Sequence, residues 1–223
     1  IGGFAGSIPD YPAAGQNTVR ALAVPYVVYR GDILRVGGEE NRGAVSGRFL
    51  NTDKYEFDIS LSASFPVDSG SNKARRDMPD LDFLFGVGPQ LIFKLINEPN
   101  QRLNFNLQAR AIYSTDFSSI DDRGYVFNPK LNFTREHVTD LNLKVSTSVG
   151  PIFATENLMD YFYTVDPEFA TPSRPAYDAD AGYLGTNLTL GVSKRFNSRF
   201  RLILGTRLGI HNGATNDDSP LFK

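Results

Sequence analysis

The stretch YEFDISLSASF, residues 55–65, alternates between apolar and polar side chains along its whole length. Because successive side chains of a β-strand point to opposite faces, this pattern predicts one strand, with Tyr55, Phe57 and Ile59 on one face and Glu56 and Asp58 on the other. Such a strand suits the core of a soluble sandwich or the wall of a membrane barrel. The rest of the chain has to distinguish these two folds.

The same alternation recurs along most of the chain and predicts about eleven strands, with no convincing helix among them. Several runs reach the roughly 9 to 11 residues that a tilted membrane strand needs, whereas strands of soluble proteins commonly have about 5 to 6. Their polar faces are rich in Ser, Thr, Asn and Gly, which suits a narrow lumen. The strands are expected near residues 1–8, 19–29, 32–38, 43–51, 54–65, 82–96, 102–115, 123–135, 139–153, 181–196 and 198–211.

The composition excludes several classes of protein. The net charge of −2 provides no basic field that would attract nucleic acid. The absence of cysteine excludes disulfides, thiolate metal sites and cysteine nucleophiles. No run of about 18 to 20 apolar residues is present, so no membrane-spanning helix is expected. The first residues contain neither the charged nor the apolar part of a signal peptide, and we therefore expect a mature start.

The connections between the expected strands alternate between long and short. Long loops, such as 66–80 and 154–180, fall at one end of the fold, and short turns, such as NTDK at 51–54 and NEPNQ at 97–101, fall at the other. In outer-membrane barrels the long loops are extracellular and the short turns periplasmic. We therefore predict an all-β fold with a single domain, residues 1–223, which is a transmembrane antiparallel up-and-down β-barrel of about 12 strands, with 10 as the fallback.

Eleven strands cannot close an antiparallel barrel, because the first and the last would run in the same direction. Bacterial single-chain barrels have even numbers of strands. We expect the stretch SPLFK, residues 219–223, only to begin the closing C-terminal strand, and the rest of that strand to be absent. The expected result is a seam of roughly 10 Å between the first strand and the strand at 199–211.

Four stretches of the chain resemble the MipA/OmpV family of Gram-negative outer-membrane proteins. They are SIPDYPAAG at 7–15, AVPYVVYRGDILRV at 23–36, the segment from DYFYTVDPEF to GVSKRF at 160–196, and NGATNDDSPLF at 212–222. The resemblance runs over nearly the whole chain. The residues that match the family motifs are Asp10, Tyr11, Pro12, Tyr161, Tyr163, Tyr177, Gly182, Asp218, Ser219 and Pro220.

This resemblance implies a location in the cell outer membrane and a structural role in the envelope. Members of the family are scaffolds that link an outer-membrane lytic transglycosylase to a murein synthase. The expected partners are therefore these two enzymes on the periplasmic side, together with membrane lipid and lipopolysaccharide. The acidic loops are interpreted as solvated rims that divalent ions bridge to lipopolysaccharide. The alternative function is a small-solute channel with a mainly cationic lumen.

No catalytic, cofactor or metal site is expected, and we predict that the protein is not an enzyme. His211 lies near Asp217, Asp218 and Ser219 in the sequence, but we interpret this as loop composition, because no strand holds the three groups together. The charges on the polar faces of the strands are expected to line the lumen. These residues are Glu56, Asp58, Lys94, Arg110, Lys130, Lys144, Arg201 and Arg207.

Overall fold

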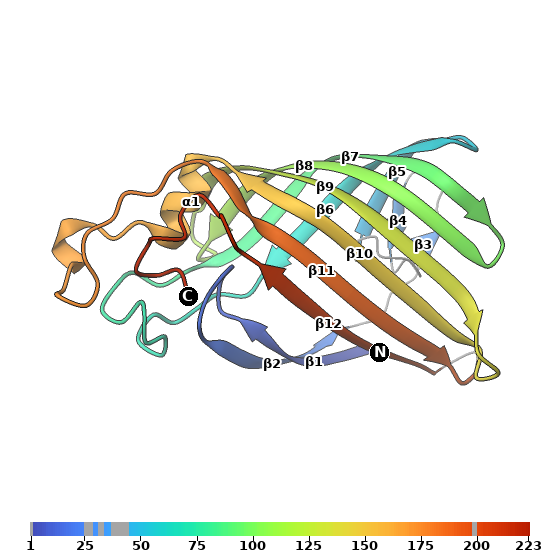
Figure 1. Cartoon of the computed structure of the whole chain (residues 1–223), viewed down its shortest axis with the longest axis horizontal. Helices are drawn as coiled ribbons and strands as arrows, with labels where there is room; N and C mark the ends of the chain where they lie inside the picture. The colour runs from blue at the N-terminus through green and yellow to red at the C-terminus, as the bar shows by residue number, and fades with distance from the viewer. Residues whose placement is uncertain (1, 25–28, 31–33, 37–44, 198–199) are drawn as a thin grey trace.

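The computed structural model describes residues 2–24, 29–30, 34–36, 45–197 and 200–223. Most of them belong to β-strands (Figure 1). The strands are β1 Gly2–Pro9, β2 Asn17–Val24, β3 Tyr29–Arg30, β4 Leu34–Val36, β5 Val45–Asn51, β6 Tyr55–Ser64, β7 Phe83–Glu98, β8 Gln101–Thr115, β9 Ile120–Val138, β10 Leu143–Ala154, β11 Gly182–Arg195 and β12 Arg201–Ile210. The helices are α1 Glu156–Tyr163 and the short 3-10 helix η1 Pro167–Phe169.

Strands β3 to β12 form one antiparallel sheet in which every strand pairs with its neighbours in sequence. Strands β1 and β2 pair with each other in a second, two-stranded sheet. Figure 1 shows the large sheet curving around a shared interior. The predicted all-β, antiparallel up-and-down fold is confirmed. Among the described residues the sheet is not closed into a barrel, and the width of the seam stays a prediction.

Strand β6 has the burial pattern of a barrel wall and not that of a soluble sheet. The side chains of Glu56 and Asp58 are each 1% exposed, whereas Tyr55, Phe57 and Leu61 are 42%, 38% and 36% exposed. The polar face therefore lies inside the curved sheet, and the apolar face lies outside. Because side chains alternate along a strand, a shift of the β6 register by one residue would exchange the two faces.

The helix α1 corrects the expectation that the chain has no helix. It begins after Thr155, which has extended backbone angles, and it buries Leu158, Met159, Phe162 and Tyr163 on one face. Eight residues are too few for a stable isolated helix, so tertiary packing of this face supplies most of its stability. A run of this length also gives a weak periodic signal in the sequence. None of the described helices has the length and apolar character needed to cross a membrane.

The C-terminal segment corrects a second expectation. The stretch at 219–223 does not begin a strand, because residues 211–222 form consecutive turns, with the amide of Ala214 donating to the carbonyl of His211 at 3.0 Å and the amide of Phe222 donating to Ser219 at 3.0 Å. The side chain of Leu221 is 0% exposed. This segment is therefore part of a packed core and not the edge of the sheet.

The long connections meet at one end of the sheet and the short turns at the other (Figure 1). We call the long connections, residues 10–16, 66–82, 155–181 and 211–223, the cap. Apolar side chains of the cap pack against the ends of β7 to β11 and form the main apolar core. This core consists of Tyr11, Val67, Leu81, Leu84, Ile112, Val126, Ala154, Leu158, Met159, Phe162, Tyr163, Val165, Ala179, Leu184 and Leu221.

The cap core lies across the interior of the sheet. In the β8–β9 register Arg110 is opposite Val126, and Gln108 is opposite Asn128. Directly opposed residues point to the same face, so the buried Val126 shares the inner face with the polar residues. The inner face therefore changes from apolar under the cap to polar in the middle of the sheet.

Candidate functional site

The family-motif residues come together in the cap, although they are far apart in the sequence. The hydroxyl of Tyr11 donates to the carbonyl of Leu221 at 2.8 Å, and the hydroxyl of Tyr163 donates to the carbonyl of Pro12 at 2.8 Å. The Ser219 hydroxyl donates to the Tyr163 carbonyl, also at 2.8 Å. Three segments of the chain are thus held to one another by buried side chains.

Asp10 links the turn after β1 to the loop at 66–82. Its carboxylate accepts hydrogen bonds from the Thr18 hydroxyl at 2.5 Å and from the Asn72 amide nitrogen at 2.7 Å. The side chains of Asp10 and Asn72 are 7% and 1% exposed. Hydrogen bonds to a carboxylate in such a buried position are stronger than average, so Asp10 is a structural anchor of the cap.

Tyr177 and Gly182 connect the segment before β11 to the C-terminal turns. The Tyr177 hydroxyl lies 2.6 Å from a carboxylate oxygen of Asp218, to which it donates. Burial, and then this hydrogen bond, raises the pKa of Tyr177. Gly182 has φ +153°, and a Cβ there would lie 2.2 Å from the Thr215 hydroxyl. No larger residue fits at this position without displacing Thr215.

Arg75 is a buried cation in the cap that the sequence analysis missed. Its side chain is 3% exposed, and its guanidinium donates to the carbonyls of Phe162 at 3.0 Å and Pro79 at 3.2 Å. The guanidinium carbon lies 5.9 Å from the centre of the Tyr11 ring. Burial lowers the pKa of Arg75. The long loop at 66–82 is therefore attached to α1 and to the turn after β1, which nothing in its own sequence indicates.

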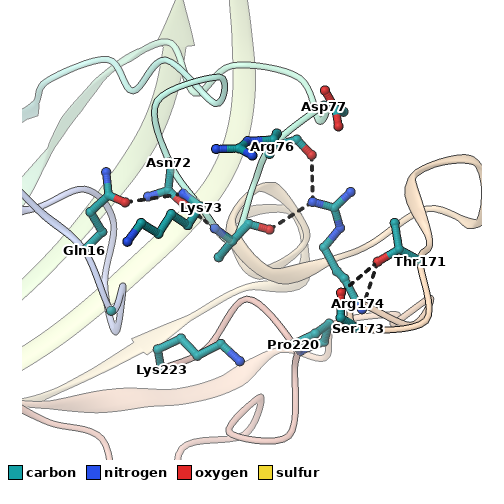
Figure 2. Close-up of a pocket in the computed structure, with 12 residues that line it drawn as sticks. Gln16, Asn72, Lys73, Arg76, Asp77, Thr171, Ser173, Arg174, Pro220 and Lys223 are labelled. Atoms are coloured by element: carbon teal, nitrogen blue, oxygen red, sulfur yellow. Dashed lines mark hydrogen bonds between the residues drawn. The ribbon is translucent and has the colours of Figure 1, made fainter.

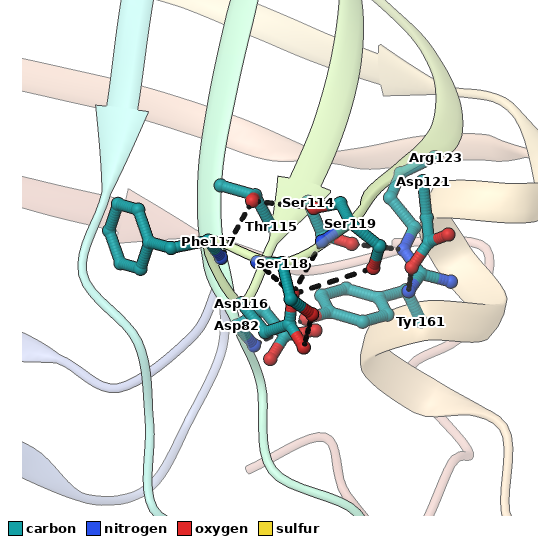
Figure 3. A network of polar contacts seen from close by, with 10 residues as sticks. All are labelled: Asp82, Ser114, Thr115, Asp116, Phe117, Ser118, Ser119, Asp121, Arg123 and Tyr161. Atoms are coloured by element: carbon teal, nitrogen blue, oxygen red, sulfur yellow. Dashed lines mark hydrogen bonds and ion pairs between the residues drawn. The ribbon is translucent and has the colours of Figure 1, made fainter.

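The outer side of the cap contains a second polar network around Tyr161 (Figure 3). The Tyr161 hydroxyl accepts a hydrogen bond from the Asp82 amide at 2.6 Å, and the Arg123 guanidinium lies 4.3 Å from the centre of the Tyr161 ring. In the adjacent β8–β9 turn, hydrogen bonds from Ser119 and Ser118 lower the pKa of the Asp116 carboxyl to about 2. These contacts order the turn.

The middle of the interior holds a chain of polar side chains across β6, β7 and β8. The Arg110 guanidinium donates to the Ser60 hydroxyl at 3.2 Å and to the Gln108 side-chain carbonyl at 3.0 Å. The Gln108 amide in turn donates to Gln90. In the β6–β7 register Gln90 is opposite Asp58. Of the predicted lumen residues, Arg110 and Asp58 thus belong to one buried polar layer.

The inner face at the short-turn end contains ion pairs in which Lys144 is a predicted lumen residue, whereas Arg102 and Glu136 were not predicted. A Glu136 carboxylate oxygen lies 2.8 Å from an Arg102 nitrogen and 3.3 Å from the Lys144 nitrogen. Glu136 follows the strand that was expected at 123–135, but β9 extends to Val138 and places this side chain inside. Lys94 donates to the Thr52 carbonyl at 2.6 Å, and so it attaches the β5–β6 turn.

Three further predicted lumen residues are Lys130, Arg201 and Arg207, and Lys130 lies close enough to Arg110 and Arg207 to interact with their charges. Lys130 is half-buried opposite Asn106, and the exposed Arg207 is opposite Thr189 on the edge strand β12. Arg201 is opposite Arg195 near the β11–β12 turn. Their role in lining a lumen stays a prediction.

His211 makes contacts that have no counterpart in a catalytic triad. Its Nδ1 atom donates to the carbonyl of Leu184 at 2.8 Å, and its ring packs edge-on against Phe222 at 5.6 Å between ring centres. The histidine thus fastens β12 to β11 and to the C-terminal turns. In the part of the chain that the structure describes, no three His, Asp or Glu side chains are grouped so that they could hold a metal ion.

The burial of Tyr11 predicts a loss of stability at alkaline pH. Burial raises the pKa of the Tyr11 phenol from its ordinary value of 10.0 to about 12. A pKa that is higher in the folded state stabilises the fold fully below the unfolded pKa, and this contribution is lost as the pH rises through the folded pKa. We therefore expect the cap to loosen between about pH 10 and 12.

Thermal unfolding of the full chain in detergent micelles across this pH range measures the effect. The variant Tyr11→Phe should show a weaker dependence on pH, whereas Tyr125→Phe, at a 60% exposed site, should behave like the parent chain. An identical pH profile for Tyr11→Phe and the parent chain would contradict the prediction.

Comparisons with known proteins agree with the sequence motifs. In the motif stretch at 23–36, residues 25–28 and 31–33 lie outside the described residues. The family-motif residues of the other three stretches are those that assemble the cap. No curated protein and no solved structure matches the chain. The model of one family, described as MltA-interacting protein MipA, matches residues 1–223. The chain therefore belongs to the MipA family.

Proposed function

We propose that this protein is an outer-membrane β-barrel that acts as a scaffold between the membrane and the murein-processing machinery. The observation that carries the proposal is the match of the whole chain, residues 1–223, to the family of MltA-interacting proteins. MltA is a lytic transglycosylase, and proteins of this family are generally found in the outer membrane of Gram-negative bacteria. A murein synthase is proposed as the second partner.

The outer surface of the sheet supports the membrane location. Large apolar side chains point outward from β6 to β12, where water would meet them in a soluble protein. Lipid is the solvent that such a surface requires, because the exposed patch extends over many strands. Examples with their exposed fractions are Phe127 44%, Leu131 42%, Val149 41%, Leu190 44%, Leu204 63% and Leu208 57%.

The structure of the cap favours a scaffold function and argues against an open channel. Met159, Tyr163 and Leu221 in its core are 1%, 0% and 0% exposed, so the interior is filled at the long-loop end. In outer-membrane barrels the long loops are extracellular and the short turns periplasmic, and we propose the same orientation for this chain. The short turns are therefore the surface that we propose for the murein-processing partners.

Binding of the purified full chain to the lytic transglycosylase tests this proposal. Reversing the charge of the exposed acids in two short turns, with Asp53→Lys and Asp140→Lys, should weaken binding by about tenfold or more, because charges at an interface select the partner. The matched control, Asp178→Lys with Asp217→Lys in the cap, should leave the affinity unchanged. Loss of affinity in the control alone would show that the partner binds the other end.

The second candidate is a small-solute channel, and the polar interior favours it. Within the described chain, the inner faces of β8 and β9 present the polar side chains of Asn106, Gln108, Asn128 and Asn132, which is the kind of lining that an aqueous path requires. Single-channel recordings in planar bilayers distinguish the two functions. The scaffold predicts negligible conductance, whereas reproducible steps that favour anions would support the channel with its cationic lumen.

A further inference from the structure

A pocket of about 570 Å³ opens on the cap, between the turn after β1, the loop at 66–82, the segment at 171–174 and the C-terminal segment (Figure 2). Its lining contains four basic residues, Lys73, Arg76, Arg174 and Lys223, and one acidic residue, Asp77. The lining therefore has a formal excess of three positive charges. In a concave site such charges act together and raise the local concentration of anions.

Two of these cations are available to a ligand. Lys73 and Arg76 are exposed, and neither side chain forms a hydrogen bond or an ion pair with any other part of the described chain. Figure 2 shows Lys73 and Lys223 on opposite sides of the hollow, with Arg174 on a third side. A ligand would not have to break an existing ion pair in order to reach these groups.

The loop that carries these cations is held in place by polar contacts within the cap. The Arg174 guanidinium donates to the carbonyls of Ala74 at 3.0 Å, Arg76 at 2.8 Å and Phe169 at 2.7 Å. The side-chain oxygen of Asn72, a residue that is 1% exposed, accepts from the Ala74 amide at 3.1 Å. The pocket is thus preformed, so little conformational entropy is lost when a ligand binds.

We propose that this pocket binds a phosphorylated saccharide. The guanidinium and ammonium groups match the oxygens of a phosphate, which accepts charge-assisted hydrogen bonds from both. The volume suits a sugar phosphate better than a bare ion, since small-molecule sites commonly measure about 300 to 1,000 Å³. Gln16, Thr171 and Ser173 also line the pocket and supply partners for sugar hydroxyls. This inference goes beyond the proposed function and does not depend on it.

Isothermal titration calorimetry of the full chain, in micelles of a detergent without phosphate or sugar, tests the proposal with glucose 1-phosphate as the probe. We expect glucose 1-phosphate to bind and glucose not to bind. The double variant Lys73→Gln, Arg76→Gln should weaken binding by about tenfold, because it removes two charge-assisted contacts. Asp77→Asn should tighten binding about two- to fivefold by removing the opposing charge, and asparagine tolerates the positive φ of 67° at this position.

The control variant Lys54→Gln, Arg135→Gln removes two exposed bases at the short-turn end and should leave the affinity unchanged. A phosphorylated disaccharide lipid, added in mixed micelles, distinguishes the source of the ligand: stronger binding than the soluble sugar phosphate identifies a membrane headgroup, and equal binding a free metabolite. Unchanged affinity in the Lys73, Arg76 double variant, or equal binding of glucose, would overturn the proposal. Because the partner is proposed to bind at the opposite end, a failure to bind glucose 1-phosphate would not contradict the proposed scaffold function.

Discussion

Replacing Phe162 by alanine should lower the free energy of unfolding by about 3 to 5 kcal/mol, the usual cost of removing a large aromatic side chain from a packed core. Phe162 is 6% exposed and belongs to the cap core. Its ring packs against Tyr11 at 6.4 Å, Tyr161 at 5.7 Å and Tyr163 at 5.9 Å between ring centres. Because Tyr11 comes from the turn after β1, whereas the other two rings belong to α1, the cavity would loosen the packing of α1 against that turn.

Chemical unfolding of the full chain in lipid vesicles measures this loss. Phe117→Ala provides a matched control, since the same atoms are removed from a side chain that is 85% exposed. We expect that control to cost less than about 1 kcal/mol. A loss of equal size at both positions would show that the cap core does not stabilise the protein.

Replacing Ile59 by arginine should cost roughly 2 to 4 kcal/mol, because this side chain lies in the middle of β6 on its apolar, outward face. A charge at this depth would face hydrocarbon if the sheet spans the membrane as proposed. The free energy of folding into lipid vesicles, compared with that of the parent chain, measures the cost. A cost close to zero would contradict the lipid-facing assignment.

The adjacent residue Ser60 supplies the control, although not in the form that the sequence suggests. Alternation alone predicts that arginine at Ser60 is tolerated, because this residue faces the interior. The structure places the Ser60 hydroxyl 3.2 Å from the Arg110 guanidinium, so that a second arginine there would meet a like charge. Ser60→Asp introduces a charge that Arg110 can pair with, and we expect a cost below about 1 kcal/mol. Comparable losses for Ile59→Arg and Ser60→Asp would contradict the assignment of the two faces.

The strands and the orientation of their faces could be predicted from the sequence because both depend on local alternation. The polarity of each residue in the stretch at 55–65 predicts the face on which its side chain lies, without knowledge of any distant contact. The separation of long loops from short turns follows from counting residues between strands. Glu136 was missed because strand ends are the least certain part of such a prediction, and β9 extends to Val138, beyond its expected end.

The assembly of the cap depends on tertiary contacts and could not be predicted from the sequence. The sequence identified Tyr11, Tyr163, Tyr177 and Asp218 as family motifs, but it could not show that they serve one packed core. The hydrogen bond from Tyr11 to Leu221 joins residues 210 positions apart, and the bond from Tyr163 to Pro12 spans 151 positions. Such contacts leave no periodic signal, because neither residue has a local reason to be buried.

The difference between local and long-range contacts explains which features of this protein the sequence determines and which depend on the tertiary structure. The alternation, the length of the strands and the separation of long loops from short turns are all local features of the sequence, and together they predicted an antiparallel sheet with an apolar outer face. Only the folded chain decided that the loops fill one end, that residues 156–163 become a helix there, and that Lys73 and Arg76 border a pocket. These features depend on which loops meet, and the loops meet only after the sheet has brought the ends of its strands together.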